Sequence, residues 1–333
     1  MRALVSTEIG GPDQLVIQEF PVPVPQAHEV LVSIKACGVN FPDTIIIRDQ
    51  YQIKPQRPFA PGGEFAGVIE QVGSDVTDLK VGDRIAATTL YGGMSEKRVV
   101  DAKACIPIPD EMNFTDAASF FLTYATTYYG LKMRGEIKRG ETLLILGATG
   151  GLGIAAIELG KYFGARVIAG VSSQEKAAIA RKAGADDILI YPRELEGIDA
   201  IRALSAEIKK RCGGEGVDVV YDSLGGGYSE AALRAMARYG RLLVIGFVAG
   251  IPKVPTNLIL LKSCQLVGVS YGGFTQKDAM GHLDICKILI GLYQQNIIRP
   301  HITAHFPLER GGEAIAMLES RKAIGKIVVD VQS

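Results

Sequence analysis

The stretch Glu141–Gly164, which reads ETLLILGATGGLGIAAIELGKYFG, decides the fold. Its first part, Thr142–Leu146, is an apolar run with the length and β-character expected of a buried parallel strand. A glycine-rich turn follows at 147–153, and the residues after it have the composition and apolar spacing of a helix. A second apolar strand, Arg166–Val171, comes at the distance typical of a βαβ unit.

The glycine turn predicts a dinucleotide site. At such a turn the backbone approaches the pyrophosphate, and the following helix offers unpaired N–H groups and the positive end of its dipole. A side chain at Gly150 would keep the phosphates away, and one at Gly153 would hold the helix and the strand apart. Ala148 departs from the commonest fingerprint, which has a glycine there. The alternative is a glycine-rich turn without a ligand.

The end of the second strand indicates which dinucleotide is bound. An NAD site usually has an Asp or Glu there for the ribose hydroxyls, whereas this chain has Ser172 and Ser173, with Lys176 in the next helix. Hydroxyls and a lysine suit a 2′-phosphate, which a carboxylate would repel. The sequence therefore favours NADPH over NADH. The alternative is that Lys176 is only a solvent-exposed charge on the helix surface.

The composition is that of an ordinary α/β protein that is long enough for two domains. The 333 residues are 47% hydrophobic, and 36 basic residues balance 36 acidic ones. A zero net charge argues against a nucleic acid or an anionic membrane as the main partner. No apolar run reaches about 18 residues, and the first residues contain no signal-peptide core, so we expect a cytoplasmic protein.

The cysteines and histidines predict no metal site. The five cysteines are odd in number and widely spaced, and the four histidines form no evident ligand set. We therefore expect free thiols in a reducing compartment and no bound zinc.

The order of the predicted elements indicates two domains. Short β-like runs alternate with Gly and Pro turns up to about Thr123, and a helix at 116–132 leads into six strands alternating with helices. This second pattern predicts a doubly wound parallel sheet with ligands at the carboxyl ends of its strands. The last predicted strand, Lys326–Val331, would pair with the N-terminal β domain. We therefore expect 1–123 and 271–333 to form one domain around a nucleotide domain at 124–270.

Several motifs occur together over nearly the whole chain. They are ACGVNFPDT (36–44), PGGEFAGVIEQVG (61–73), VGDRI (81–85), GATGGLG (147–153), DVVYDSLGG (218–226) and GKIVVD (325–330). In this order they resemble the medium-chain dehydrogenase/reductase superfamily, and specifically its zinc-free quinone oxidoreductase branch, which includes zeta-crystallin. The resemblance implies a Rossmann sheet inserted in the chain and an irregular, mostly-β, GroES-like catalytic domain.

Three departures separate the chain from the zinc alcohol dehydrogenases. Asn40 stands where those enzymes have a metal-binding Cys, and Gly62-Gly63-Glu64 replaces their Gly-His-Glu run. The cysteine-rich lobe that holds their structural zinc is also absent from the sequence. Without these ligands the Lewis acid of alcohol oxidation is missing, so that subgroup does not fit.

The resemblance implies an NADPH-dependent reductase of quinones. One alternative is a reductase of enones or of acryloyl-CoA-type thioesters, for which Arg48, Lys54 and Arg57 are candidates to bind the CoA phosphates. Another is a non-enzymatic, NADPH-binding structural protein. The resemblance also implies a homodimer formed through the edge strand predicted at Leu266–Ser270.

The candidate catalytic residues are Asn40, Asp43 and Tyr51, of which the resemblance implies the first two. Asn40 and Asp43 would lie near the nicotinamide, and Asn40 or Tyr51 would donate a hydrogen bond to an enolate. The alternatives are a turn residue for Asn40, a helix cap or ion-pair partner for Asp43, and a loop aromatic for Tyr51. Lys326 would reach the cofactor, unless it is a surface lysine.

The candidate cofactor-binding residues fall into four groups along the dinucleotide. All are implied by the resemblance except Val269 and Ser270, which are predicted from their place at the carboxyl end of a strand. The nicotinamide end has Asn40, Thr126 and Lys326; the pyrophosphate has Gly150, Gly151, Leu152 and Gly153; the 2′-phosphate and its ribose have Ser172, Lys176 and Tyr191; and the strand ends contribute Ser223, Gly246, Phe247, Val269 and Ser270.

Overall fold

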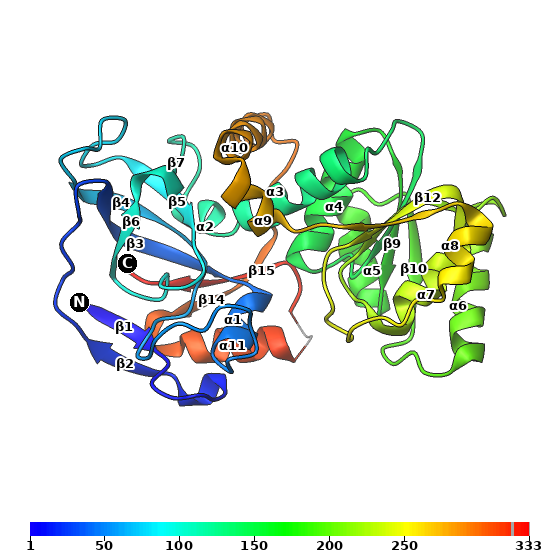
Figure 1. Ribbon diagram of the computed structural model, residues 1–333, viewed down its shortest axis with the longest axis horizontal. Coiled ribbons are helices and arrows are strands. Elements are labelled where there is room, and N and C mark those ends of the chain that lie inside the picture. Colours follow the sequence, from blue (N-terminus) through cyan, green and yellow to red (C-terminus); the bar gives the residue numbers. More distant parts are fainter. Residues whose placement is uncertain (321–322, 333) are drawn as a thin grey trace. The chain divides into compact units, whose positions relative to one another are not determined.

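The computed structural model describes residues 1–320 and 323–332 (Figure 1). Contacts divide the chain into two units. The first comprises Met1–Leu122 and Arg299–Ser333, and the second comprises Thr123–Ile298. The predicted boundary at 270/271 is therefore wrong, because α9 (Tyr271–Lys277) and α10 (Ala279–Gln294) belong to the second unit. The rings of Tyr271 and Phe274 contact Tyr129 there, at centroid distances of 5.8 and 4.6 Å.

The second unit contains the doubly wound sheet that the sequence predicts. Within the described residues its six strands run in the order β10-β9-β8-β11-β12-β13, with every neighbouring pair parallel. They are β8 (Thr142–Leu146), β9 (Arg166–Val171), β10 (Asp187–Ile190), β11 (Val217–Asp222), β12 (Met236–Val244) and β13 (Gln265–Gly268). Leu143–Leu146 are fully buried, as expected of a central strand covered on both faces.

Helices connect these strands in turn. They are α4 (Gly151–Tyr162), α5 (Gln174–Lys182), α6 (Ile198–Arg211), α7 (Gly226–Ala235) and α8 (Thr256–Lys262). The chain proceeds from β8 toward one edge through β9 and β10, and then returns to β11 and proceeds toward the other edge. The carboxyl ends of β8 and β11 are thus the switch point where ligands bind in such sheets.

The segment before β8 is less regular than the helix predicted at 116–132. It consists of α2 (Phe114–Ala117), α3 (Phe121–Tyr128) and a π-helical segment, Tyr129–Arg134. The side-chain oxygen of Asn113 accepts the N–H of Asp116 at 2.7 Å and caps α2, so the helix begins at Phe114, before the predicted start at residue 116.

The first unit contains a mixed sheet of seven strands within the residues described. Its order is β14-β15-β3-β4-β5-β7, and β6 also pairs with β3. The strands are β3 (Glu29–Val39), β4 (Glu64–Val72), β5 (Arg84–Thr88), β6 (Lys97–Asp101), β7 (Cys105–Pro107), β14 (Ile302–Pro307) and β15 (Lys326–Asp330), while β1 (Arg2–Val5) and β2 (Val16–Glu19) form a separate pair. Short 3-10 turns occur at Pro12–Gln14, Ala102–Ala104 and Leu308–Arg310.

The last strand joins the N-terminal sheet, which confirms the predicted pairing. β15 runs antiparallel to β3 with Ile327 opposite Val39 and Val328 opposite Gly38, and Figure 1 shows the two strands side by side. Two helices of this unit, α1 (Phe41–Ile46) and α11 (Gly311–Glu319), pack on each other. This pairing brings Lys326, the first residue of β15, to the end of β3.

Candidate active site

Asn40 links the end of β3 to the start of α1. Its backbone is extended, with φ −131° and ψ 160°, so it is not a turn residue of positive φ. The backbone N–H of Asn40 donates to Oδ2 of Asp43 at 2.8 Å, three residues later in the first turn of α1. A carboxylate in that position accepts a hydrogen bond from an otherwise unpaired N–H at the helix N-terminus, and the positive end of the helix dipole stabilises its charge.

Asp43 also binds the loop before β4. Its Oδ1 accepts the N–H of Gly62 at 3.0 Å, so both oxygens hold backbone groups. Asp43 is 1% exposed, and burial raises its pKa to about 6 against the opposing effect of the two backbone N–H groups. Gly62 has φ +95°, and a Cβ there would lie 2.5 Å from the sulfur of Cys37, so this close approach requires glycine.

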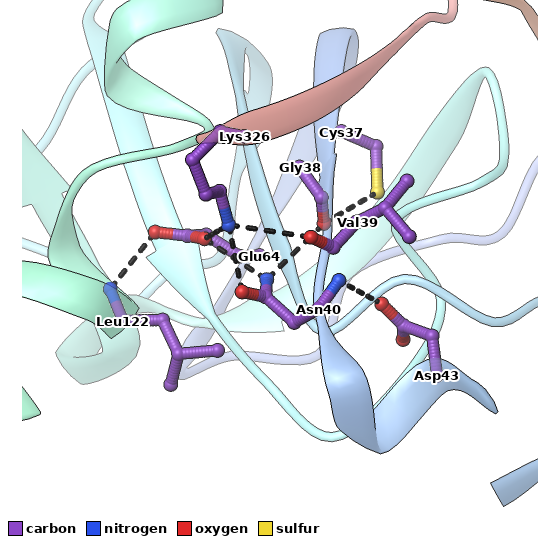
Figure 2. Close-up of polar contacts among 8 residues, drawn as sticks. All are labelled: Cys37, Gly38, Val39, Asn40, Asp43, Glu64, Leu122 and Lys326. Atoms are coloured by element: carbon purple, nitrogen blue, oxygen red, sulfur yellow. Dashed lines mark hydrogen bonds and ion pairs between the residues drawn. The ribbon is translucent and has the colours of Figure 1, made fainter. Parts of the chain in front are cut away.

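A buried cluster of polar side chains lies beside Asn40 (Figure 2). The ammonium of Lys326 donates to Oδ1 of Asn40 at 2.6 Å and to Oε2 of Glu64 at 3.1 Å. The other oxygen of Glu64 accepts the backbone N–H of Leu122 at 2.8 Å. Lys326 is 4% exposed and Glu64 is not exposed, so Lys326 is not a surface lysine. A buried ammonium requires such a carboxylate partner.

The cluster fixes the orientation of the Asn40 amide. Its Nδ2 donates to Oε2 of Glu64 at 3.0 Å and to the carbonyl oxygen of Gly38 at 3.3 Å. A flipped amide would place N–H groups against the ammonium of Lys326 and an oxygen against the carboxylate, so only the observed orientation satisfies both. The contact with Gly38 is the longest hydrogen bond that the amide makes, and therefore the weakest by geometry.

The structure brings together three of the predicted site residues, Asn40, Asp43 and Lys326, and it adds Glu64. Glu64 was visible in the Gly62-Gly63-Glu64 motif, but nothing in the sequence shows that it meets Lys326, 262 residues later. Tyr51 is half-buried and packs against the hydrophobic core of the first unit. In the part of the chain that the structure describes, no group of three or more His, Cys, Asp and Glu side chains is placed to hold a metal ion.

The glycine turn of the second unit has the predicted form. Gly150 is the N-cap of α4, so residues 151–153 form the first helical turn, whose N–H groups have no intrahelical partner. A Cβ at Gly153 would lie 2.3 Å from the carbonyl oxygen of Gly147, which confirms the steric need for glycine there. A Cβ at Gly150 would meet only that oxygen, at 3.7 Å. The protein itself therefore leaves space beside Gly150.

The residues predicted to bind the 2′-phosphate follow β9 and β10. Ser172 comes directly after β9, and the hydroxyl of Ser173 accepts the N–H of Lys176 at 3.3 Å and caps α5. Burial, together with the neighbouring guanidinium of Arg193, lowers the pKa of Lys176. Two adjacent cations suit a bound phosphate. Arg193 lies two residues after the predicted Tyr191, and no sequence motif pointed to it.

Tyr228 holds the segment that carries Arg193. Its hydroxyl lies 2.7 Å from the carbonyl oxygen of Pro192 and 2.9 Å from that of Arg193. The ring of Tyr228 packs against that of Tyr191 at 5.1 Å, and burial raises the pKa of Tyr191. Tyr191 is thus buried, and its ring packs against Tyr228.

The other predicted residues lie at the carboxyl edge of the sheet or near it. The hydroxyl of Ser223 donates to the carbonyl oxygen of Leu146 at 2.8 Å and closes the switch point between β8 and β11. β13 ends before the predicted Ser270, so Val269 and Ser270 lie in the loop after it. Gly246 and Phe247, which is 47% exposed, lie in the loop after β12. Thr126 is half-buried in α3.

Comparisons with known proteins agree with these two units. Residues 26–110 match the alcohol dehydrogenase GroES-like domain, and residues 151–285 match the zinc-binding dehydrogenase family. Quinone oxidoreductase-like protein 2 of Rattus norvegicus is 36% identical over 99% of this chain and 92% of its own length. Quinone oxidoreductase of Homo sapiens is 30% identical over 99% and 97%.

A solved structure extends the likeness to three dimensions. The quinone oxidoreductase of Escherichia coli, crystallised as a complex with NADPH, is 31% identical and superposes with a TM-score of 0.91, covering 99% of this chain and all of its own. The first unit is thus a GroES-like, mostly-β domain, and the second is a Rossmann-type domain. No helix within the described residues is both long and apolar enough to span a bilayer.

Proposed function

Because the chain belongs to the quinone oxidoreductase family of the medium-chain dehydrogenase/reductase superfamily, we propose that it reduces quinones with NADPH by hydride transfer, without a metal ion. The observation that carries this proposal is the cluster around Lys326. Asn40 stands where the zinc enzymes have a ligand, and its amide is bound to a buried ammonium instead. A second positive charge beside that ammonium would be unfavourable.

NADPH supplies the hydride when it is bound, and the quinone takes up this hydride and a proton to become a hydroquinone. The protein has to hold the two rings about 3 to 3.5 Å apart and exclude water. Lys326 acts through Asn40, because its ammonium withdraws electron density from the amide and makes the amide N–H groups stronger donors. The N–H that faces Gly38 is the group that we assign to a carbonyl oxygen of the cofactor or the quinone.

Asp43 and Tyr51 have different roles in this proposal. Asp43 is a positioning residue, since both its oxygens hold the backbone on either side of the cluster. Tyr51 is the proposed proton donor, because a phenol is the kind of group that an enolate or a quinone oxyanion requires. Substituting Phe for Tyr51 tests this role, since it removes the hydroxyl and keeps the ring in the core.

The second unit binds NADPH in this proposal. The first turn of α4, with Gly150, Gly151, Leu152 and Gly153, holds the pyrophosphate. Ser172, Lys176, Tyr191 and Arg193 hold the 2′-phosphate and its ribose, and the adjacent cations of Lys176 and Arg193 support this assignment. The remaining residues contact the adenosine or nicotinamide parts; these are Thr126, Ser223, Gly246, Phe247, Val269 and Ser270.

The thioester alternative loses part of its support in the structure. Of the three cations considered for the CoA phosphates, Arg48 is paired with Glu319, and Arg57 is paired with Asp49 at 2.8 Å. Both also donate to backbone carbonyl oxygens, Arg48 to Thr44 and Arg57 to Ile47. These contacts stabilise the first unit and leave fewer charges for a phosphate.

The test follows NADPH oxidation by its absorbance with 1,4-benzoquinone, a simple enone and acryloyl-CoA, before and after treatment with EDTA. Saturable turnover of the quinone that survives EDTA is the expected result. Turnover of acryloyl-CoA with inert quinones would move the chain to the thioester reductases. NADPH binding without turnover of any acceptor would leave a non-enzymatic role, and loss of activity with EDTA would overturn the metal-free mechanism.

We also propose that the chain forms a homodimer through β13. Within the described residues this strand pairs only with β12, and Leu260 and Leu261 on the adjacent α8 are 79% and 65% exposed. Open strand edges beside apolar side chains are suited to pairing with a second copy. Light scattering should give twice the chain mass, and Leu260→Lys with Leu261→Lys should lower it; a wild-type monomer would overturn the proposal.

We also propose a cytoplasmic location, since each of the five cysteines has a free thiol.

A further inference from the structure

An aromatic cluster of the second unit has no role in the mechanism proposed above. The rings of Tyr129 and Phe274 are stacked, with centroids 4.6 Å apart and an interplanar angle of 25°. Tyr271 is tilted against both, at 5.8 Å from each. Tyr271 is buried, whereas Tyr129 and Phe274 are half-buried and present part of their rings to the surroundings.

A buried hydrogen bond holds Tyr271, one ring of the cluster, in place. The hydroxyl of Tyr271 and Nδ1 of His282, on α10, lie 2.6 Å apart, and the two rings are also in edge contact at 5.7 Å. The sulfur of Cys286 lies 3.7 Å from the same nitrogen. Burial lowers the pKa of His282, which keeps the ring neutral and able to share a proton with the phenol. Moving Tyr271 would leave a buried polar group unsatisfied.

The cluster lies at the edge of the sheet where ligands bind. Tyr271 follows β13 directly beyond its carboxyl end, with Val269 and Ser270 between them. Tyr129 comes three residues after Thr126, one helical turn further along the same segment. The helix changes there from α to π, a distortion that is frequent at functional sites.

Packing joins these two segments. A Cβ at Gly130 would lie 3.4 Å from the side chain of Val269, so the segment after β13 lies directly against the π-helical segment. Thr126, which we assign to the nicotinamide end, and Val269, a predicted cofactor-binding residue after β13, therefore adjoin the aromatic cluster from two sides.

We propose that Tyr129 and Phe274 determine acceptor specificity by stacking on polycyclic aromatic quinones, and that Tyr271 and His282 are positioning residues that hold them. This inference rests on the proposed function and deepens it. Fixed, partly exposed rings favour a flat aromatic partner, because stacking adds to the burial of apolar area. A fused-ring quinone has more such area than a single-ring quinone, so the cluster should raise kcat/KM selectively for the larger acceptor.

The first experiment compares 9,10-phenanthrenequinone with 1,4-benzoquinone in wild type, Tyr129→Leu and Phe274→Leu. The ratio of interest is kcat/KM for 9,10-phenanthrenequinone divided by kcat/KM for 1,4-benzoquinone. It should fall about ten-fold in each variant, with the KM for NADPH unchanged. Tyr128→Leu is the matched control, because Tyr128 precedes Tyr129 but packs against Phe163, and its ratio should equal that of wild type.

The outcomes separate the two proposals. A wild type that oxidises NADPH with both quinones, together with an unchanged ratio in Tyr129→Leu and Phe274→Leu, would overturn this inference alone. A wild type that is inactive with both quinones would overturn the proposed function and this inference with it.

The second experiment tests the positioning role of His282. His282→Leu cannot hydrogen-bond Tyr271, and its ratio should fall as in Phe274→Leu. His282→Gln retains a group that can donate to or accept from the phenol, and should restore most of the ratio. Equal ratios for the Leu and Gln variants, at equal thermal stability, would show that His282 does not act through Tyr271.

Discussion

Lys326 and Asn40 are joined by a hydrogen bond of 2.6 Å, although 286 residues separate them in the chain (Figure 2). The bond exists because the last strand returns to pair with β3, and it places an ammonium beside the amide that follows that strand. Glu64 on β4 completes the arrangement by accepting from both residues. The proposed catalytic chemistry of the first unit depends on this three-residue cluster.

Replacing Glu64 by Gln should destabilise the protein strongly. The substitution keeps the shape but leaves the ammonium of Lys326 buried without a counter-charge, which costs roughly 3 to 5 kcal/mol of unfolding free energy. Urea denaturation measures this loss. Replacing Lys326 by Met in the same chain should recover most of it, because the unpaired charge is then removed.

The matched control for this prediction is Glu70→Gln, on the same strand. Glu70 pairs with Lys97 at 2.6 Å, but both side chains are about one-third exposed. Its loss should stay below about 1 kcal/mol, as for other exposed ion pairs. Equal losses for the Glu64 and Glu70 variants would contradict the importance of the buried charge pair.

Asp43 should make the folded protein less stable as the pH rises from 4 to 6. Burial raises its pKa to about 6 in the folded state, whereas the unfolded carboxyl has its ordinary pKa of 3.8. Between these values the folded state binds more protons than the unfolded state, so this contribution to the unfolding free energy is lost as pH rises from 4 to 6. A shift of two pKa units corresponds to about 3 kcal/mol.

The measurement is the unfolding free energy of wild type minus that of Asp43→Asn, taken from acid to neutral pH. The difference should decrease as pH rises, because the variant lacks the titrating group and the other carboxyls cancel. A difference that is constant or that increases with pH would show that the pKa of Asp43 is not raised in the fold.

Lys176 and Arg193 should control the choice of cofactor. Replacing either by Met should raise the KM for NADPH about ten-fold or more, since each charge-assisted bond to a phosphate is worth about 1.5 to 3 kcal/mol. The KM for NADH should hardly change, because NADH lacks the 2′-phosphate. Lys182→Met, at the exposed end of the same helix, is the control. An equal effect on both cofactors would place the 2′-phosphate elsewhere.

Much of the fold could be predicted because buried parallel strands are continuous apolar runs. The bounds of β8 and β9 coincide with those predicted, and the return of the last strand to the N-terminal sheet is confirmed. The division at 270/271 was wrong because residues 271–298 belong to the second unit through contacts such as those of Tyr129, which local sequence does not reveal. The break in the predicted helix at 116–132 likewise depends on tertiary packing.

The site was predictable where a motif marks it and not where tertiary contacts build it. Asn40 and Gly153 belong to recognisable motifs, and the structure gives each a steric or polar reason. Glu64 meets Lys326 only after the sheet has formed, and Arg193 comes near Lys176 in a segment that the hydroxyl of Tyr228 holds. Such contacts between distant residues leave no periodic signal in the sequence.

The most direct test of the whole account is NADPH-dependent reduction of 1,4-benzoquinone by Gly150→Ala beside wild type. The backbone at Gly150 has φ −76° and ψ 170°, which alanine adopts freely, and the added methyl would have 3.7 Å to its nearest neighbour. The variant should therefore fold with an unchanged Tm, whereas Gly153→Ala should not.

The methyl group at Gly150 would occupy the space through which the pyrophosphate approaches the turn. We predict saturable quinone reduction by the wild type and a KM for NADPH raised about ten-fold or more in Gly150→Ala, equivalent to about 1.4 kcal/mol of lost binding. Equal KM values for the two proteins, or a wild type that reduces no quinone, would contradict the account.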